Sequence, residues 1–406
     1  MRRHAVVFIV CFVIVLLRRP DAILHAQFWA EDGKLWYAEA YNIGLSSLIH
    51  PAAGYFQTLP RLTALAALPL PLSVAPLFLN VIAIVFQILP VHFLLSSRCR
   101  EFGTVGARAL FAFIYLALPN SHELHANITN AQWRLAFLAF LILFARPGKT
   151  VWWNVFDYIV VILSALTGPF IVFIAPIAAI AYFLDDRNRH RFGLIVTSLC
   201  GVVVELSSLF LTGGSDRPID DVRAASSELA VRIMAKQVLL APLLGRRFLG
   251  HFSFDSHWGF QLAVAAVVIG LLIELYVLIR APLPWKSFLV FAFLIFAGTL
   301  ATPTTASPQW PNLLNSGGVR YWFFPMLAFV GSLVWLLSDR NPLWLRRSGV
   351  VLLAVMVFGI VQDWGHPRLV DLHYDEYVER FAQARPGTPF VFPLNPPGFI
   401  MKLMKR

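Results

Sequence analysis

The sequence predicts an all-α protein that crosses a membrane many times, and three observations support this fold class. The 406 residues are 58% hydrophobic and only 14% charged, which is too apolar for a soluble protein of this length. Apolar runs suited to spanning helices repeat from end to end. The 33 Lys and Arg residues fall in short clusters between those runs. This is the positive-inside pattern, so the charge indicates topology, and we expect no nucleic-acid partner.

We expect about eleven transmembrane helices in a bundle. The first covers about residues 5–20. We expect it to be retained, because Arg18 and Arg19 directly follow its apolar run, 5–17, without a convincing signal-peptidase site. Both arginines are expected to reach the interface. Residues 59–71 are short and bounded by prolines, so we interpret them as re-entrant or interfacial. The other spans are expected near 73–96, 108–119, 132–145, 153–167, 169–184, 193–211, 259–280, 286–301, 321–338 and 348–361.

The basic clusters agree with a cytoplasmic N-terminus, and an odd number of crossings then leaves the C-terminus outside. The small external tail and the lack of a cysteine pattern for disulfides favour a bacterial inner membrane. We divide the chain into a transmembrane domain, 1–361, and a small external tail, 362–406. In the tail, 371–381 has the pattern of a short amphipathic helix and 390–393 that of a short strand. The external loops of the transmembrane domain are expected at 21–58, 120–131, 212–258 and 302–320.

Two adjacent carboxylates, Glu31 and Asp32, follow the first span. Acids beside a membrane are costly to keep charged unless water, a metal or a cation reaches them, so the pair is a candidate functional site. The alternative is that both acids open an interfacial helix, where the helix dipole favours them. Residues 33–50 have the pattern of an amphipathic surface helix, and its aromatic face, with Trp36 and Tyr37, is expected in the lipid headgroups.

The second external loop carries His122, Glu123 and His125 in a dense polar run. These residue types serve as metal ligands or as acid and base groups, although ordinary solvated loop residues would look the same. Glu123 is the strongest candidate, because a reaction at this face needs a second acid opposite the first. A divalent metal, Mg²⁺ or Mn²⁺, is a candidate cofactor that Asp32 and Glu123 could hold.

A third group of candidates surrounds Arg320, which follows Gly317 and Gly318 and precedes Tyr321. The planar fork of arginine binds phosphate oxygens at two points, so Arg320 suits the phosphate of a membrane lipid. The alternative is an anchor to bulk headgroups. The segment 212–258 carries charges of both signs, and the sequence does not distinguish their roles. These residues are Lys236, Arg246, Arg247, Asp216, Asp220 and Asp221.

This arrangement resembles the GT-C superfamily of integral-membrane glycosyltransferases, which includes protein O-mannosyltransferases and lipid A aminoarabinose transferases. Its members carry an acid or acidic pair in the first external loop, then surface helices and a proline-containing helix start, as in Glu31-Asp32, 33–50 and Pro60. A further acid matches Glu123, and an arginine for the donor phosphate matches Arg320. The chain departs from the family in its single proline, its Glu-Asp order and its small tail, and these departures bear on the acceptor.

The resemblance implies an inverting transfer of a sugar from a polyprenyl-phosphate donor. The acceptor would be a cell-envelope glycan, such as lipopolysaccharide O-antigen, or a lipid-linked molecule. Membrane lipids would surround the protein. Asp32 or Glu31 would deprotonate the acceptor hydroxyl, with Glu123 as a further catalytic acid. Arg320 would stabilise the departing phosphate. The remaining substrate contacts are expected from Tyr321, His122, His125 and Trp29.

Two other functions remain open from sequence. A transporter or flippase of lipid-linked saccharides would use charged residues within spans, and Glu205 and Glu274 are candidates if they pair across a cavity. An O-antigen polymerase or ligase would instead place catalysis in 212–258, around Arg246 and Arg247. Such a ligase should tolerate loss of Asp32.

Overall fold

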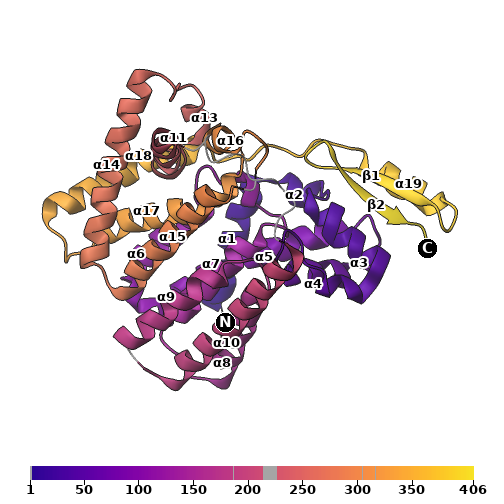
Figure 1. Ribbon diagram of the computed structural model, residues 1–406, viewed down its shortest axis with the longest axis horizontal. Coiled ribbons are helices and arrows are strands. Elements are labelled where there is room, and N and C mark those ends of the chain that lie inside the picture. The colour runs from indigo at the N-terminus through magenta and orange to yellow at the C-terminus, as the bar shows by residue number, and fades with distance from the viewer. Residues whose placement is uncertain (1, 186, 214–225, 304, 316) are drawn as a thin grey trace.

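The computed structural model is mostly helical, and its long apolar helices indicate a membrane-embedded protein (Figure 1). The termini lie well apart, with the C-terminus at the end of a small β-hairpin. The structure describes these residues: 2–185, 187–213, 226–303, 305–315 and 317–406.

In the described ranges, six helical segments are long and apolar enough to cross a membrane: α5 (Ala75–Leu95), α10 (Arg189–Thr212), α14 (His257–Arg280), α15 (Leu283–Ala301), η7 (Val319–Trp322) continued by α17 (Phe323–Leu336), and α18 (Leu343–Gln362). Five further apolar helices are shorter: α1 (Arg2–Arg18), α6 (Val105–Ala117), α7 (Ala131–Phe144), α8 (Val151–Ala165) and α9 (Ile171–Leu184). They overlap the expected spans. The count of about eleven crossings stays a prediction, because helices of about 14 residues are only about 21 Å long, against a hydrocarbon core of about 30 Å.

Short helices form the connections. Those of the first loop are α2 (Asp21–Leu24), the π-helix η1 (Asp32–Tyr37), α3 (Ala38–Ile43), the 3₁₀-helix η2 (Gly44–Ile49) and α4 (Thr58–Ala67). The others are η3 (Ser97–Phe102), η4 (His122–Leu124), α11 (Ser227–Ile233), the π-helix η6 (Met234–Leu240), α12 (Ala241–Leu244), α13 (Arg246–Leu249) and α16 (Gln309–Asn315). With 10 residues, α4 spans about 15 Å and is too short to cross, which agrees with an interfacial piece.

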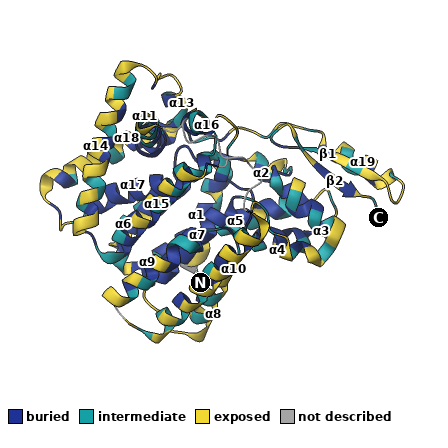
Figure 2. Cartoon of the chain, viewed as in Figure 1, coloured by how far each residue is buried: buried dark blue, intermediate teal, exposed yellow. Residues whose placement is uncertain are grey.

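The core of the bundle lies around α7 and α17, in which every residue is buried. Phenylalanine rings interlock there: the ring of Phe324 lies 4.7 Å from that of Phe291, and the ring of Phe140 lies 5.1 Å from that of Phe288. The outer helices α14 and α18 instead expose most of their length (Figure 2). An exposed apolar surface of this kind is what lipid would cover.

The ends of α1, α6 and α18 meet at Arg18. Its guanidinium donates to the carbonyl oxygens of Leu116 and Leu118 at 2.5 and 2.9 Å, and to those of Asp363 and Trp364 at 3.3 and 3.1 Å. Carbonyls at a helix C-terminus lack partners and lie at the negative end of the helix dipole, so they attract the cation. The expectation that Arg18 reaches the interface was therefore wrong. We call this side of the bundle the first-loop end.

The opposite side of the bundle is closed by Arg98, and we call it the Arg98 end. Its guanidinium contacts both carboxylate oxygens of Asp157 at 2.7 Å and the carbonyl of Arg146 at 2.7 Å. His190 also lies 2.8 Å from Asp157. The loops before α6, α8 and α10 thus meet here, so the predicted alternation of helix directions agrees with the structure at these positions.

The first loop packs against protein, and its aromatic face is not free for lipid. Trp36 and Tyr37 are both buried. The indole nitrogen of Trp36 donates to the Thr129 hydroxyl of the second loop at 2.9 Å, and the guanidinium of Arg61 lies 5.1 Å from its ring. The expected contact of this face with headgroups was wrong. A helical period shows which side chains share a face, but it does not show whether lipid or another loop covers that face.

The tail covers the outer side of the first loop. It contains α19 (Tyr374–Gln383) and an antiparallel hairpin of β1 (Pro389–Leu394) and β2 (Phe399–Met404), in the positions predicted for a helix and a strand. Figure 1 shows the hairpin beside α3. Asn42 bonds the backbone of β2 twice, and a Cβ at Gly33 would lie 2.9 Å from Leu394. The glycine after the acidic pair therefore lets the tail approach closely.

Candidate functional site

At the first-loop end, Glu123 and Arg320 form an ion pair across 197 residues of sequence. The guanidinium of Arg320 bonds one carboxylate oxygen of Glu123, and the backbone N–H of Arg320 donates to the other at 3.0 Å. The guanidinium also donates to the Tyr321 hydroxyl at 3.0 Å. The two charged side chains remain 29% and 18% exposed. The ion pair joins two of the three predicted parts of the site, the second loop and the segment around Arg320. Both side chains stay accessible to solvent or substrate.

The backbone around this ion pair is shaped by its neighbours. Gly318 has φ +66°, and a Cβ there would lie 2.4 Å from the ring of Tyr321, so only glycine allows this turn without strain. On the other side, the amides of Asn127 and Asn130 donate to the Glu123 carbonyl at 2.8 and 2.9 Å. Contacts within each loop therefore support the positions of the two partners.

Tyr55 connects the ion pair to the first loop. The pKa of Tyr55 is raised to about 12, mainly by burial and then by the charge of Tyr321, while Arg320 and a hydrogen bond with Gln132 act to lower it. Glu31 also raises the pKa of Tyr55. Side chains from three segments that are distant in sequence therefore lie within electrostatic range of Tyr55.

The amide of Gln132, at the first turn of α7, links the second loop to the first. Its side-chain oxygen accepts from the Gln57 amide at 3.3 Å, besides its bond with Tyr55. A Cβ at Gly168, where φ is +87°, would lie 2.2 Å from that oxygen. The predicted turn before α9 therefore needs glycine to admit Gln132.

Asp32 is buried and fully engaged. It is 1% exposed, and its carboxylate accepts from the Thr129 N–H at 2.8 Å, the Thr129 hydroxyl at 2.5 Å and the Ile128 N–H at 3.3 Å. Burial raises the pKa of Asp32 to about 7, although the bonds from Thr129 and Ile128 lower it. The side chain ties the first loop to the second and leaves little room for a substrate atom.

Glu31, the other acid of the pair, has a different environment. It is partly exposed, and among the described residues its carboxylate has no hydrogen bond or ion pair. It acts electrostatically on both Asp32 and Tyr55. Of the two adjacent acids, Glu31 is therefore the one whose oxygens are not bonded to a described residue.

Strained backbone borders the region. Ala30, directly before the acidic pair, has φ +40°, and Asn120 and Ala126 in the second loop have φ +51° and +52°. Residues with a Cβ rarely adopt such angles, at a cost of about 1–3 kcal/mol each, and they gather at functional sites. Tertiary contacts, such as the bond from the Ala30 N–H to the Asn395 carbonyl of the tail, hold Ala30 in place.

The two histidines differ in their availability. His125 is buried, with its ring nitrogens 2.9 Å from the Val15 carbonyl and 3.3 Å from the Gln87 amide, and burial lowers its pKa well below the usual value. It is an interior residue, so its expected contact with substrate is not supported. His122 is partly exposed; burial, followed by the charge of Arg246, lowers its pKa to about 4. His122 is therefore neutral near pH 7.

Trp29 lies on the tail side of the first loop. Its ring is 5.5 Å from the Arg19 guanidinium, and its backbone pairs with Asn395. Arg19 itself is buried and donates to the His125 carbonyl at 3.2 Å, so its expected position at the interface was also wrong. No contact among the described side chains joins Trp29 to Arg320.

The expected metal site at Asp32 and Glu123 stays a prediction, and both carboxylates have protein partners in this structure. Both Asp32 oxygens accept hydrogen bonds, and Glu123 is paired with Arg320. Within the described ranges, no three His, Cys, Asp or Glu residues are grouped so as to hold a metal ion.

The other expected charges are placed as follows. Glu205 accepts from the Phe56 N–H at 3.2 Å, so it holds the end of the first loop, and no hydrogen bond joins it to Glu274 in the described part of the chain. Three acids of the 212–258 segment lie outside the described residues: Asp216, Asp220 and Asp221.

Three residues of the region were not predicted from sequence: Tyr55, Thr129 and Gln132. Thr129 and Gln132 fall in the polar run that drew attention to Glu123, so their position at the mouth of a span was the available signal. Tyr55 has no such signal. Searches with protein-family models and among curated proteins find no match for this chain.

Proposed function

We propose that this protein is a membrane glycosyltransferase of the GT-C type that moves a sugar from a polyprenyl-phosphate donor to an acceptor hydroxyl. The observation that supports the proposal is the open ion pair of Arg320 with Glu123, with an unpaired carboxylate, Glu31, in the first loop: Arg320 and Glu31 both act electrostatically on Tyr55. A transfer from a lipid phosphate needs a base for the acceptor and a cation for the leaving group.

In the proposed reaction Glu31 takes the proton of the acceptor hydroxyl. The oxygen attacks the anomeric carbon, the bond from that carbon to the donor phosphate oxygen breaks, and its electron pair stays on the phosphate. Configuration inverts. Arg320 binds the phosphate, which gains charge as the bond breaks, and the fork of its guanidinium suits two phosphate oxygens.

The other residues of the region position these two. Asp32 joins the first and second loops through Thr129 and so holds Glu31 beside Tyr55. Glu123 holds the Arg320 guanidinium until the donor phosphate replaces it. Asp32 is a positioning residue in this mechanism, because its own oxygens are already bonded.

The proposal includes a setting. The first-loop end faces the periplasm of a bacterial inner membrane, the N-terminus is cytoplasmic and the tail is external. The acceptor is a cell-envelope glycan or a lipid-linked saccharide, reached from the aqueous side of the loops.

The test is transfer of label from a panel of radiolabelled polyprenyl-phosphate hexoses to membrane glycans by the native protein. Glu31→Gln should lower the rate by about 10²–10⁴-fold, the usual contribution of a general base. Glu379→Gln is the matched control, because Glu379 is an exposed acid of α19 without an ion pair among the described residues, and it should transfer at the native rate. Equal rates for Glu31→Gln and native protein, or no transfer from any donor in the panel, would remove this proposal.

A further inference from the structure

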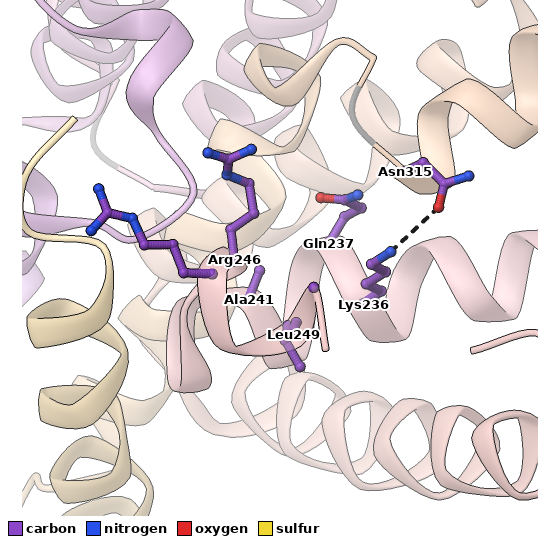
Figure 3. Close-up of a pocket in the computed structure, with 8 residues that line it drawn as sticks. Lys236, Gln237, Ala241, Arg246, Leu249 and Asn315 are labelled. Atoms are coloured by element: carbon purple, nitrogen blue, oxygen red, sulfur yellow. Dashed lines mark hydrogen bonds between the residues drawn. The ribbon is translucent and has the colours of Figure 1, made fainter. Parts of the chain in front are cut away.

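A pocket of about 270 Å³ lies beside the candidate site at the first-loop end. It is bordered by η6, α12, α13 and the end of α16 (Figure 3). Its polar lining consists mainly of Lys236, Gln237, Arg246, Arg247 and Asn315. None of the lining residues is an Asp or Glu, so the described walls carry three cations and no carboxylate.

These cations have few bonded partners. The guanidinium of Arg246 has no hydrogen bond or ion pair with any described residue. The Lys236 ammonium has a long contact of 3.5 Å to the Asn315 side chain, lies 5.6 Å from the Phe254 ring and has Asp255 as an electrostatic neighbour. In Figure 3 the side chains of Arg246 and Lys236 extend in the same direction as that of Gln237. Arg247 donates to the Gly365 carbonyl at 2.6 Å. Like charges gathered in a concave site repel one another and favour an anion between them.

The backbone under Arg246 is held firmly. Asp363 accepts from the N–H groups of Arg246 and Arg247 at 2.6 and 3.2 Å, so both of its oxygens are bonded to the start of α13. The turn before α13 has Gly245 at φ +82°, and a Cβ at Gly359 would lie 2.6 Å from the Leu243 carbonyl. This packing presents Arg246 to the pocket from a fixed base.

The pocket borders the segment that leads to Arg320. The Gln237 amide donates to the Leu314 carbonyl at 2.7 Å, and Lys236 contacts Asn315. Trp258, at the start of the span α14, is 79% exposed, as is typical of an aromatic residue at headgroup depth. The pocket therefore borders the segment that leads to the candidate site.

We propose that this pocket binds a phosphate or diphosphate group, in a site separate from the Glu123–Arg320 ion pair. Arginine and lysine are the side chains that recognise such groups, and the amides of Gln237 and Asn315 can donate to further oxygens. The volume is below that of pockets for drug-sized ligands, about 300–1,000 Å³, which suits a phosphate group better than a saccharide chain. The proposal does not depend on sugar transfer.

The proposal is tested by titration calorimetry on the full-length protein in nanodiscs of neutral phosphatidylcholine. The two probes are inorganic diphosphate and a short-chain polyprenyl diphosphate. Arg246→Gln should weaken binding by about 10- to 100-fold, as expected for a lost charge-assisted hydrogen bond, and Arg246→Lys should keep most of it. Arg347→Gln, which removes an exposed arginine at the start of α18, far from the pocket, should bind like the native protein.

The two probes separate the sources of the phosphate. Binding of inorganic diphosphate as tightly as the lipid supports a site for the free anion, and tighter binding of the lipid supports a site for a lipid-borne group. Loss of affinity in Arg347→Gln equal to that in Arg246→Gln, or no binding of either probe, would overturn the proposal. A transfer assay does not enter this test, so it can fail or succeed independently of the glycosyltransferase function.

Discussion

The molecule contains a buried or partly buried arginine–carboxylate pair at each end of its bundle, and the two differ in how completely they are closed. At the Arg98 end, Arg98 and Asp157 are 7% and 0% exposed, and the guanidinium uses Nε and both terminal nitrogens. At the first-loop end, Arg320 and Glu123 are 29% and 18% exposed. The same chemistry therefore serves two roles: the closed pair joins helices, and the open pair can exchange one partner for a ligand.

The largest expected effect is on stability at the closed pair. Arg98→Met should lower the free energy of unfolding by about 3–5 kcal/mol, because it leaves the Asp157 carboxylate buried with His190 as its remaining side-chain partner. The fraction of purified protein that stays monodisperse after heating measures this. A loss below about 1 kcal/mol would show that the pair is not a structural clamp.

A smaller effect is expected on activity at the open pair. Arg320→Lys keeps the charge but loses the planar fork, so we expect transfer to fall about tenfold, while thermal stability stays within about 1 kcal/mol of the native value. Initial transfer rates at saturating acceptor measure this. If lysine supports the native rate, a point charge is sufficient and two-point binding of phosphate is not needed.

A third prediction concerns Asp32, a buried carboxylate of the first-loop end that lacks an arginine partner. Burial raises its pKa to about 7, so between about pH 4 and 7 the folded chain holds a proton that the unfolded chain has released. Its contribution to stability therefore falls as pH rises through this window and levels off above the folded pKa. From pH 6 to 8 this loss amounts to about 1 kcal/mol. Asp32→Asn should lack it, and parallel stability curves for the two proteins would contradict the assignment.

The smallest effect is expected at the exposed pair of Arg146 and Glu101, also at the Arg98 end. Their side chains are 58% and 43% exposed, and such pairs contribute little. Arg146→Gln should change the free energy of unfolding by less than about 0.5 kcal/mol, and it keeps the backbone carbonyl that Arg98 contacts. If Arg146→Gln lowers the free energy of unfolding as much as Arg98→Met does, burial does not explain the difference in stability between the two pairs.

Much of the architecture could be predicted from sequence because apolar runs and basic clusters are local signals. They located the helices now seen at α5, α10, α14 and α18 and gave the shared direction of α1, α6 and α18. The environment of individual polar residues could not be predicted in the same way. Arg18 and Trp36 were expected at the membrane surface, but helix ends and a second loop, both distant in sequence, bury them.

The candidate site shows the same division. The position of Glu123 and Arg320 at the same end of the bundle could be predicted, because topology alone puts their loops there, but their ion pair was not predicted. The difference between Glu31 and Asp32 could not, since adjacent acids look alike in sequence and only the bonds from Thr129 and Ile128 separate them. Tyr55 was missed because nothing in its sequence neighbourhood distinguishes it from an ordinary loop residue.

The most direct measurement compares the transfer rate per folded molecule of Arg320→Met with that of Arg98→Met. If the open pair binds the leaving phosphate, Arg320→Met should lose about 10²–10³-fold, while the Arg98→Met molecules that fold should transfer within about threefold of the native rate. Equal losses in both variants, or a native rate in Arg320→Met, would contradict the separation of a functional pair from a structural one.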